Sequence, residues 1–124
     1  MQNAKLISFI STANPDKART FYRDVIGLTL VTEEPIALVF DAVGVMLRVS
    51  VVKDLKPQQF TVLGWQVPDI RTSLNELKPK GVTFEQYGFS GQDADGIWTT
   101  QDGTKVAWFK DPDGNLLSLT QFPE

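Results

Sequence analysis

The chain has 124 residues, 42% of them hydrophobic and 22% charged, which suits one soluble globular domain and is too short for two of ordinary size. Lys and Arg number 12 against 15 Asp and Glu, and this net charge of −3 argues against a sequence-independent grip on nucleic-acid phosphates. The absence of Cys and His excludes disulfides, thiolate nucleophiles, the commonest metal ligand and the commonest general base.

The first half of the chain predicts the element order β-α-β-β-β. Residues 6–11 are rich in β-branched and aromatic side chains and predict a strand. Asn14 suits a helix N-cap and Pro15 the first helical position, and an apolar stripe predicts a helix over 15–26 that ends at Gly27. Further strands are expected at 28–32, 36–40 and 45–52.

The same pattern starts again after a polar linker at 53–59. Residues 60–67 predict a strand, and an apolar stripe of Ile70, Leu74 and Leu77 predicts a helix that ends by Gly81. Further strands are expected at 82–86, 97–101, 105–110 and 116–121. The sequence therefore predicts one domain over 1–124 that contains two similar modules, about 1–53 and 60–124.

Two motifs carry a resemblance to a known family. One is the hairpin turn Asp111-Pro112-Asp113-Gly114 with the strand after it, and the other is the first-helix run Phe21-Tyr22-Arg23-Asp24-Val25-Ile26-Gly27-Leu28. Together they resemble the vicinal oxygen chelate (VOC) superfamily, which includes glyoxalase I, extradiol dioxygenases and bleomycin resistance proteins. The resemblance implies an α+β fold in which two βαβββ modules form a cupped, barrel-like mixed sheet with helices on the outer face.

The resemblance also locates the positions where metal-using members carry their metal ligands. They fall at Ile7, Arg48, Val62 and Ser118, none of which is an ordinary metal ligand. We therefore expect no metal and no other cofactor. Strand alternation from these positions predicts a groove with an apolar lining and a few polar groups. The candidate ligand-binding residues are Ile7, Phe9, Arg48, Val62, Gln66, Trp98 and Ser118.

Arg48 has two interpretations that the sequence leaves open. A guanidinium on a groove wall cannot lose its proton, so it needs a carboxylate, solvent or a ligand anion. In the first interpretation it pairs with Asp41, Glu33 or Glu85 or reaches solvent. In the second it recognises an anionic group of the ligand.

The polar, glycine-rich segment 88–96 also has two interpretations. It is either a mobile surface loop or a lid whose aromatic edge consists of Tyr87, Phe89 and Trp98. We expect Trp108 to be a core residue, whereas Trp98 suits either the core or stacking on a ligand.

The resemblance favours a metal-independent protein that binds an apolar or aromatic small molecule, with an anionic group if Arg48 contacts it. The alternative is a glyoxalase- or dioxygenase-like enzyme with non-standard catalytic residues, none of which the sequence identifies. A purely structural role is a third option. The expected partners are a small-molecule ligand and a second copy of the chain, and neither nucleic acid nor membrane. The N-terminus lacks a signal pattern, so we expect a cytoplasmic protein.

Overall fold

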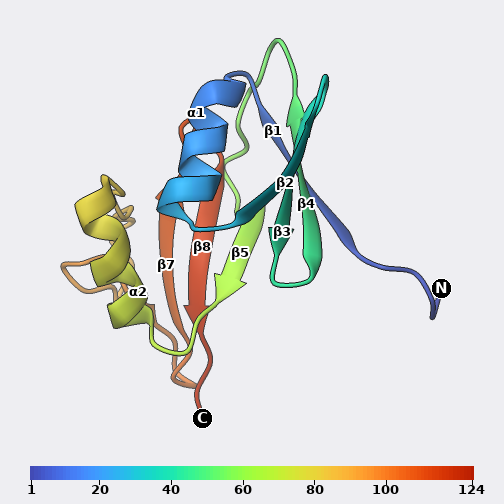
Figure 1. Ribbon diagram of the computed structural model, residues 1–124. Helices are drawn as coiled ribbons and strands as arrows, with labels where there is room; N and C mark the ends of the chain where they lie inside the picture. The colour runs from blue at the N-terminus through green and yellow to red at the C-terminus, as the bar shows by residue number, and fades with distance from the viewer. The chain divides into compact units, whose positions relative to one another are not determined.

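The computed structural model describes residues Met1–Glu124 as two compact units, Met1–Lys56 and Pro57–Glu124 (Figure 1). Each unit contains a four-stranded mixed sheet and one α-helix, and each follows the order β-α-β-β-β. This confirms the predicted α+β class and the duplication of one module.

The first unit contains β1 (Ile7–Thr12), α1 (Pro15–Thr20), a π-helical segment (Phe21–Val25), β2 (Thr29–Glu34), β3 (Ala37–Ala42) and β4 (Val45–Val51). The strand order is β1-β4-β3-β2, with β1 parallel to β4 and the other neighbours antiparallel. The expected strand boundaries are correct to within two residues at each end.

Local sequence explains the bounds of the first helix. The Asn14 side chain accepts a hydrogen bond from the Lys17 amide at 3.2 Å, as expected of an N-cap, and Pro15 occupies the first helical position. Gly27 follows the helical residues with a φ of 89°, which a residue without Cβ adopts at little cost. The last turn is π-helical, with the Ile26 amide bonded to the Phe21 carbonyl, a detail that the apolar stripe did not predict.

The core of the first unit lies between α1 with its π-helical extension and one face of the sheet. Tyr22 is fully buried, with its ring 5.0 Å from that of Phe21 and 6.0 Å from that of Phe40. The sheet contributes the buried side chains of Ile10, Leu38, Phe40, Leu47 and Val49. Each such side chain contributes about 1.5–3 kcal/mol by its burial.

The second unit contains β5 (Leu63–Gln66), α2 (Ile70–Leu77), a 3-10 turn (Lys78–Lys80), β6 (Trp98–Thr99), β7 (Lys105–Lys110) and β8 (Leu116–Gln121). The strand order is β5-β8-β7-β6, again with a parallel pair between the first and last strands in the sequence. The expected hairpin of 105–110 and 116–121 is confirmed residue for residue.

One expected strand is wrong. Residues 82–86 form no strand and touch the sheet only through a bridge between Phe84 and Phe109 and a hydrogen bond from the Glu85 amide to the Trp108 carbonyl. The next side chain, that of Gln86, donates to the Asp93 and Ala94 carbonyls instead, which directs the chain into the loop before β6.

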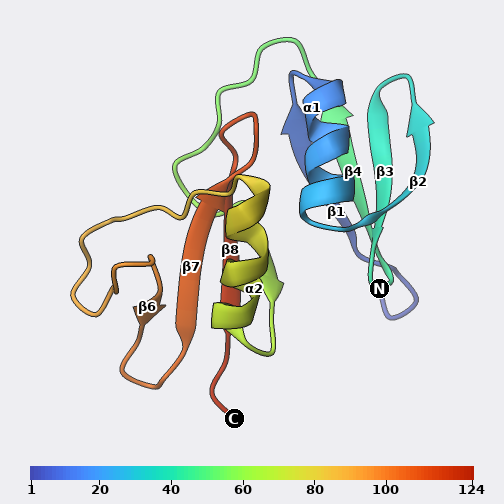
Figure 2. The ribbon, with the colours of Figure 1, turned by 60° about the vertical axis from the view of Figure 1, so that its left-hand side comes forward.

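Helix α2 packs against β7 and β8 through its apolar stripe (Figure 2). Its buried residues are Ile70, Leu74 and Leu77, and they meet a sheet face of buried Ala107, Phe109, Leu117 and Leu119. Asp69 caps the helix by accepting from the Arg71 and Thr72 amides. Neither helix of the protein is long and apolar enough to cross a membrane.

Candidate ligand site

The face of the second sheet that α2 does not cover, here called its open face, carries the clearest candidate site. Trp108 lies opposite Ser118 in the β7–β8 pair, and Trp98 lies opposite Val106, two residues before Trp108 on β7. Since side chains alternate along a strand, Trp98, Trp108 and Ser118 share one face, opposite to the face that α2 covers.

Four aromatic rings form a continuous cluster on this face. Tyr87 and Phe89 are 5.4 Å apart, and Trp108 lies 5.4 Å from Tyr87 and 5.9 Å from Phe89. Trp98 is 5.5 Å from Phe89 and 6.0 Å from Trp108. Tyr87 and Phe89 remain 43% and 45% exposed, so two of the four aromatic residues in the cluster are accessible to solvent.

The hydrogen-bond donors of both indole rings are used inside the unit. Trp98 Nε1 donates to the Ser90 carbonyl at 3.2 Å, and Trp108 Nε1 donates to Thr61 Oγ1 at 3.1 Å. The tryptophans therefore offer a ligand their ring faces and edges rather than their N–H groups.

A charged pair and a phenol border the aromatic cluster. Lys110 Nζ lies 3.2 Å from Glu85 Oε1, next to the segment that leads to Tyr87. Burial and the nearby Glu85 carboxylate raise the pKa of the Tyr87 phenol above its ordinary value of 10.0, and Lys110 opposes this shift. Tyr87 is therefore a neutral hydroxyl near pH 7.

The same face brings β5 close to β8. Ser118 is only 7% exposed and lies opposite Gly64, where an added Cβ would stand 2.6 Å from Ser118 Oγ. Val62 precedes β5 and is half-buried, with its amide bonded to the Leu116 carbonyl, and Gln66 is exposed on β5. At the position of the family's last-strand glutamate, a buried hydroxyl thus packs against a glycine.

The face of the first sheet that its helix does not cover also carries exposed apolar side chains. Ile7 lies opposite Met46, and Phe9 lies opposite Arg48 in the parallel β1–β4 pair. Ile7, Phe9 and Met46 are 43%, 60% and 41% exposed. The predicted residues Ile7, Phe9 and Arg48 therefore share one face of this unit, as strand alternation requires.

Arg48 forms an ion pair with Glu34, a partner that the sequence interpretation did not name. Its Nη2 lies 2.6 Å from Glu34 Oε1, and Nη1 lies 3.5 Å from Oε2. The hydrogen bond from Arg48 lowers the pKa of Glu34 below its ordinary value, and the same bond raises the pKa of Arg48. The pair leaves the arginine side chain 23% exposed.

The three expected partners of Arg48 are each engaged elsewhere. Glu33 accepts from Arg19, Glu85 pairs with Lys110, and Asp41 accepts from the Gly44 amide. The structure thus corrects the identity of the carboxylate and leaves Arg48 paired within its own unit.

The structure places Trp98 and Ser118 on one face of the second unit and adds Tyr87, Phe89 and Trp108 to them. Trp108 is half-buried in the aromatic cluster and not in the α2-facing core, so its expected place was wrong. Its register opposite Ser118 across the hairpin is the sequence signal that identifies its face.

The four family metal positions do not fit a metal ion. Ile7 and Val62 carry no donor atom, Arg48 is a cation paired with Glu34, and Ser118 presents only a hydroxyl. No group of three His, Cys, Asp or Glu side chains gathers elsewhere as a metal site.

Two βαβββ units, each with a parallel pair joining its first and last strands, define the class of protein. The chain belongs to the Glyoxalase/Bleomycin resistance protein/Dioxygenase superfamily, whose family model matches residues 6–119. Comparison with curated proteins gives no match.

Solved structures with the same fold share little sequence with this chain. A lactoylglutathione lyase from Agrobacterium tumefaciens has a TM-score of 0.73 and 16% identity, covering 96% of this chain and 93% of its own. TnmS3, an antibiotic binding protein from Streptomyces sp. CB03234, has a TM-score of 0.72 and 20% identity, covering 98% and 97%. A glyoxalase/bleomycin resistance protein/dioxygenase from Alicyclobacillus acidocaldarius has a TM-score of 0.73 and 20% identity, covering 98% and 93%. At such identities the likeness concerns the fold.

Proposed function

We propose that the protein binds an apolar or aromatic small molecule without a metal ion, and that the ligand stacks on the aromatic cluster of the second unit. The observation that carries this proposal is the exposure of Tyr87 and Phe89 within a cluster of four touching rings. A soluble protein ordinarily covers such rings, so their exposure supports a binding role.

The chemistry of the cluster favours a ligand with a planar apolar body. Both indole N–H groups are already bonded to Ser90 and Thr61, so the attraction comes from ring stacking and apolar contact. Hydrogen-bond selectivity then depends on the neutral Tyr87 hydroxyl and on the neighbouring Glu85–Lys110 pair.

An anionic group on the ligand is a secondary element of the proposal. Arg48, in the first unit, is bonded to Glu34, so an anion that binds on that unit must compete with this carboxylate. A second anion partner is Lys110, whose side chain is 56% exposed beside the cluster.

The enzyme alternative differs from this proposal in what it requires. A glyoxalase- or dioxygenase-like reaction of the metal-dependent kind needs ligands other than Ile7, Arg48, Val62 and Ser118. Elemental analysis after dialysis separates the two, because one equivalent of a transition metal whose removal lowers the melting temperature would refute metal-independent binding.

We also propose that the chain acts as a single cytoplasmic domain that forms a homodimer. Phe60 and Phe122 are 62% and 54% exposed near strand ends, which suits a surface covered by a second copy. Light scattering that gives the mass of one chain, 13.8 kDa, would contradict the dimer.

The test of ligand binding is a thermal-shift screen of aromatic compounds, small anions and antibiotics, followed by titration of any compound that stabilises the protein. Phe89→Ala should weaken binding about tenfold, because it removes one stacking ring and its apolar area. Ile36→Ala is the control, since Ile36 is an exposed apolar side chain that lies outside both the aromatic cluster and the proposed dimer surface. Equal affinity of Phe89→Ala and the wild-type protein would refute the proposed site.

A further inference from the structure

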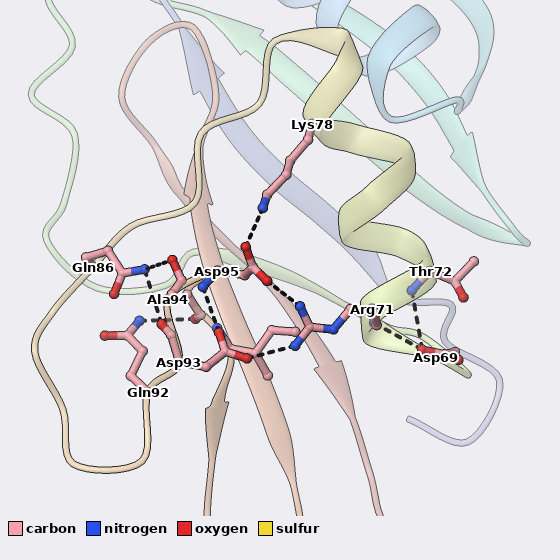
Figure 3. Close-up of polar contacts among 11 residues, drawn as sticks. Asp69, Arg71, Thr72, Lys78, Gln86, Gln92, Asp93, Ala94 and Asp95 are labelled. Carbon is pink, nitrogen blue, oxygen red and sulfur yellow. Dashed lines mark hydrogen bonds and ion pairs between the residues drawn. The ribbon is translucent and has the colours of Figure 1, made fainter.

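The segment 86–97 contacts residues on both sides of the second sheet. At its start, Phe89 packs on Trp98 and Trp108 on the open face. Towards its end, Asp93 and Asp95 reach Arg71 of α2, the helix that covers the opposite face (Figure 3). The segment therefore passes around the β6 edge and is held at both sides.

The contacts with α2 form a compact charge network. Arg71 Nη2 lies 2.7 Å from Asp93 Oδ2, and Arg71 Nη1 lies 2.5 Å from Asp95 Oδ2. Lys78 adds a second cation 2.9 Å from Asp95 Oδ1. The Arg71 guanidinium thus bridges two carboxylates that lie two residues apart in the loop. Its planar arrangement of N–H donors suits such a contact.

Asp93 connects the Arg71 contacts to the aromatic cluster. While its Oδ2 faces Arg71, its Oδ1 accepts from the Asp95 amide at 2.9 Å and from the Ile97 amide at 3.0 Å. Ile97 directly precedes Trp98, whose indole N–H bonds back to the Ser90 carbonyl, next to Phe89. The Asp93 carboxylate therefore connects α2 to the backbone segment that carries Phe89 and Trp98.

Amide side chains close the rest of the segment on itself. Gln92 Nε2 donates to the Glu85 and Gly96 carbonyls, and its Oε1 accepts from the Tyr87 amide at 2.8 Å. Gln86 Nε2 donates to the Ala94 carbonyl at 2.9 Å. These bonds connect the part of the segment around Asp93 to the part that carries Tyr87 and Phe89.

We infer that Arg71 is a positioning residue for the aromatic site: from the far side of the sheet it holds Asp93 and Asp95, and this fixes Phe89 and Trp98 in the arrangement that a ligand meets. The inference rests on the proposed function. The network is exposed, with side-chain accessibilities of 42% to 48% for Arg71, Asp93 and Asp95, so dissolved salt weakens it. The affinity of the aromatic site should therefore fall as ionic strength rises.

The experiment compares Arg71→Gln and Arg71→Lys with the wild-type protein. Arg19→Gln is the matched control, because Arg19 also bridges two carboxylates, Asp16 and Glu33, but belongs to the first unit. Three readouts are followed at low and high salt: hydrogen exchange of the Ile97 amide, near-ultraviolet circular dichroism of the coupled tryptophans, and affinity for the aromatic probe anilinonaphthalene sulfonate.

In Arg71→Gln we expect faster exchange of the Ile97 amide, a weaker near-ultraviolet signal, and a loss of probe affinity of about three- to tenfold. The salt dependence of the exchange rate and of the near-ultraviolet signal should also disappear. Arg71→Lys should recover part of each effect, since an ammonium can pair with one carboxylate, and Arg19→Gln should resemble the wild-type protein. If Arg71→Gln does not fold, Asp93→Asn serves instead, because it keeps the Oδ1 acceptor and loses the charge.

Wild-type exchange, dichroism and affinity in Arg71→Gln would overturn the positioning role. Faster exchange with unchanged probe affinity would overturn it as well, since the anchor would then be merely structural. If the wild-type protein binds the probe but Phe89→Ala does not weaken that binding, the proposed function fails, and this inference fails with it.

Discussion

The substitution Gly64→Ala tests the close approach of β5 to β8 on the open face of the second sheet. The new Cβ would stand 2.6 Å from Ser118 Oγ, 3.5 Å from its carbonyl oxygen and 4.0 Å from its Cβ. The first contact is closer than real Cβ atoms tolerate, whereas the other two are ordinary contacts. Only the Ser118 hydroxyl therefore has to move, and Ser118→Ala removes the obstacle.

The magnitude follows from two opposing effects. Overpacking costs about 1–3 kcal/mol, and a hydroxyl that can rotate places this case near 1 kcal/mol. Gly→Ala also restricts the unfolded chain, which returns about 0.4–1 kcal/mol. The net change in Gly64→Ala alone is therefore small, but a double-mutant cycle with Ser118→Ala cancels the unfolded-state term and should give a coupling energy of about 1 kcal/mol.

The assay is urea unfolding of the four proteins of the cycle, followed by far-ultraviolet circular dichroism. The slopes against urea should agree among them, since the surface exposed on unfolding barely changes. A coupling energy below about 0.3 kcal/mol, the usual limit of additivity, would refute the close packing of Ser118 on Gly64.

Three further predictions concern other parts of the chain. Leu74→Ala empties a fully buried position under α2 and should cost about 2–5 kcal/mol in urea unfolding; a smaller loss would contradict the packing. Arg48→Met should raise the pKa of Glu34, as measured by NMR titration. If an anionic ligand binds Arg48 by displacing Glu34, the same substitution should lower the affinity for that ligand about ten- to hundredfold. Hydrogen bonds from Lys78 and Arg71 lower the pKa of Asp95 below 3.8. The contribution of these bonds to the stability of the folded protein is therefore complete above that pH and is lost as pH falls below it. Thermal melts of Arg71→Gln should show a shallower loss of stability in acid than those of the wild-type protein.

The regular elements were predictable because their causes are local. The Asn14 cap, the Pro15 start and the Gly27 stop fixed the bounds of the first helical segment, and alternation around Asp111-Pro112-Asp113-Gly114 fixed the last hairpin. The strand expected at 82–86 failed because its polar continuation bonds to the following loop, a contact that no local propensity encodes.

The partner of Arg48 could not be predicted because it depends on a bulge. In an unbroken β2–β3 register Glu33 would lie on the face of Arg48, but the register shifts between Leu30 and Thr32. The extra residue turns Glu33 towards Arg19 of α1 and brings Glu34 to Arg48 instead. A shift of one residue thus exchanged the roles of two adjacent glutamates.

The aromatic cluster was predictable only in part. The glycine-rich composition of 88–96 suggested a lid edged by Tyr87, Phe89 and Trp98, and these three rings do gather. Neither the anchoring of the loop by Arg71 nor the contribution of Trp108 followed from composition, since both depend on which residues the sheet brings opposite one another.

The parallel pairing of the first and last strands has a consequence for how the chain folds. β1 pairs with β4 and β5 pairs with β8, so the earliest strand of each unit has no partner until the latest one has formed. All pairings of the first sheet lie within Ile7–Val51, so during synthesis this sheet can close before the second unit exists. β5 must wait for Leu116–Gln121, so its backbone groups stay unpaired over a longer stretch of synthesis than those of β1, and we expect aggregation or chaperone binding to involve this strand more than β1.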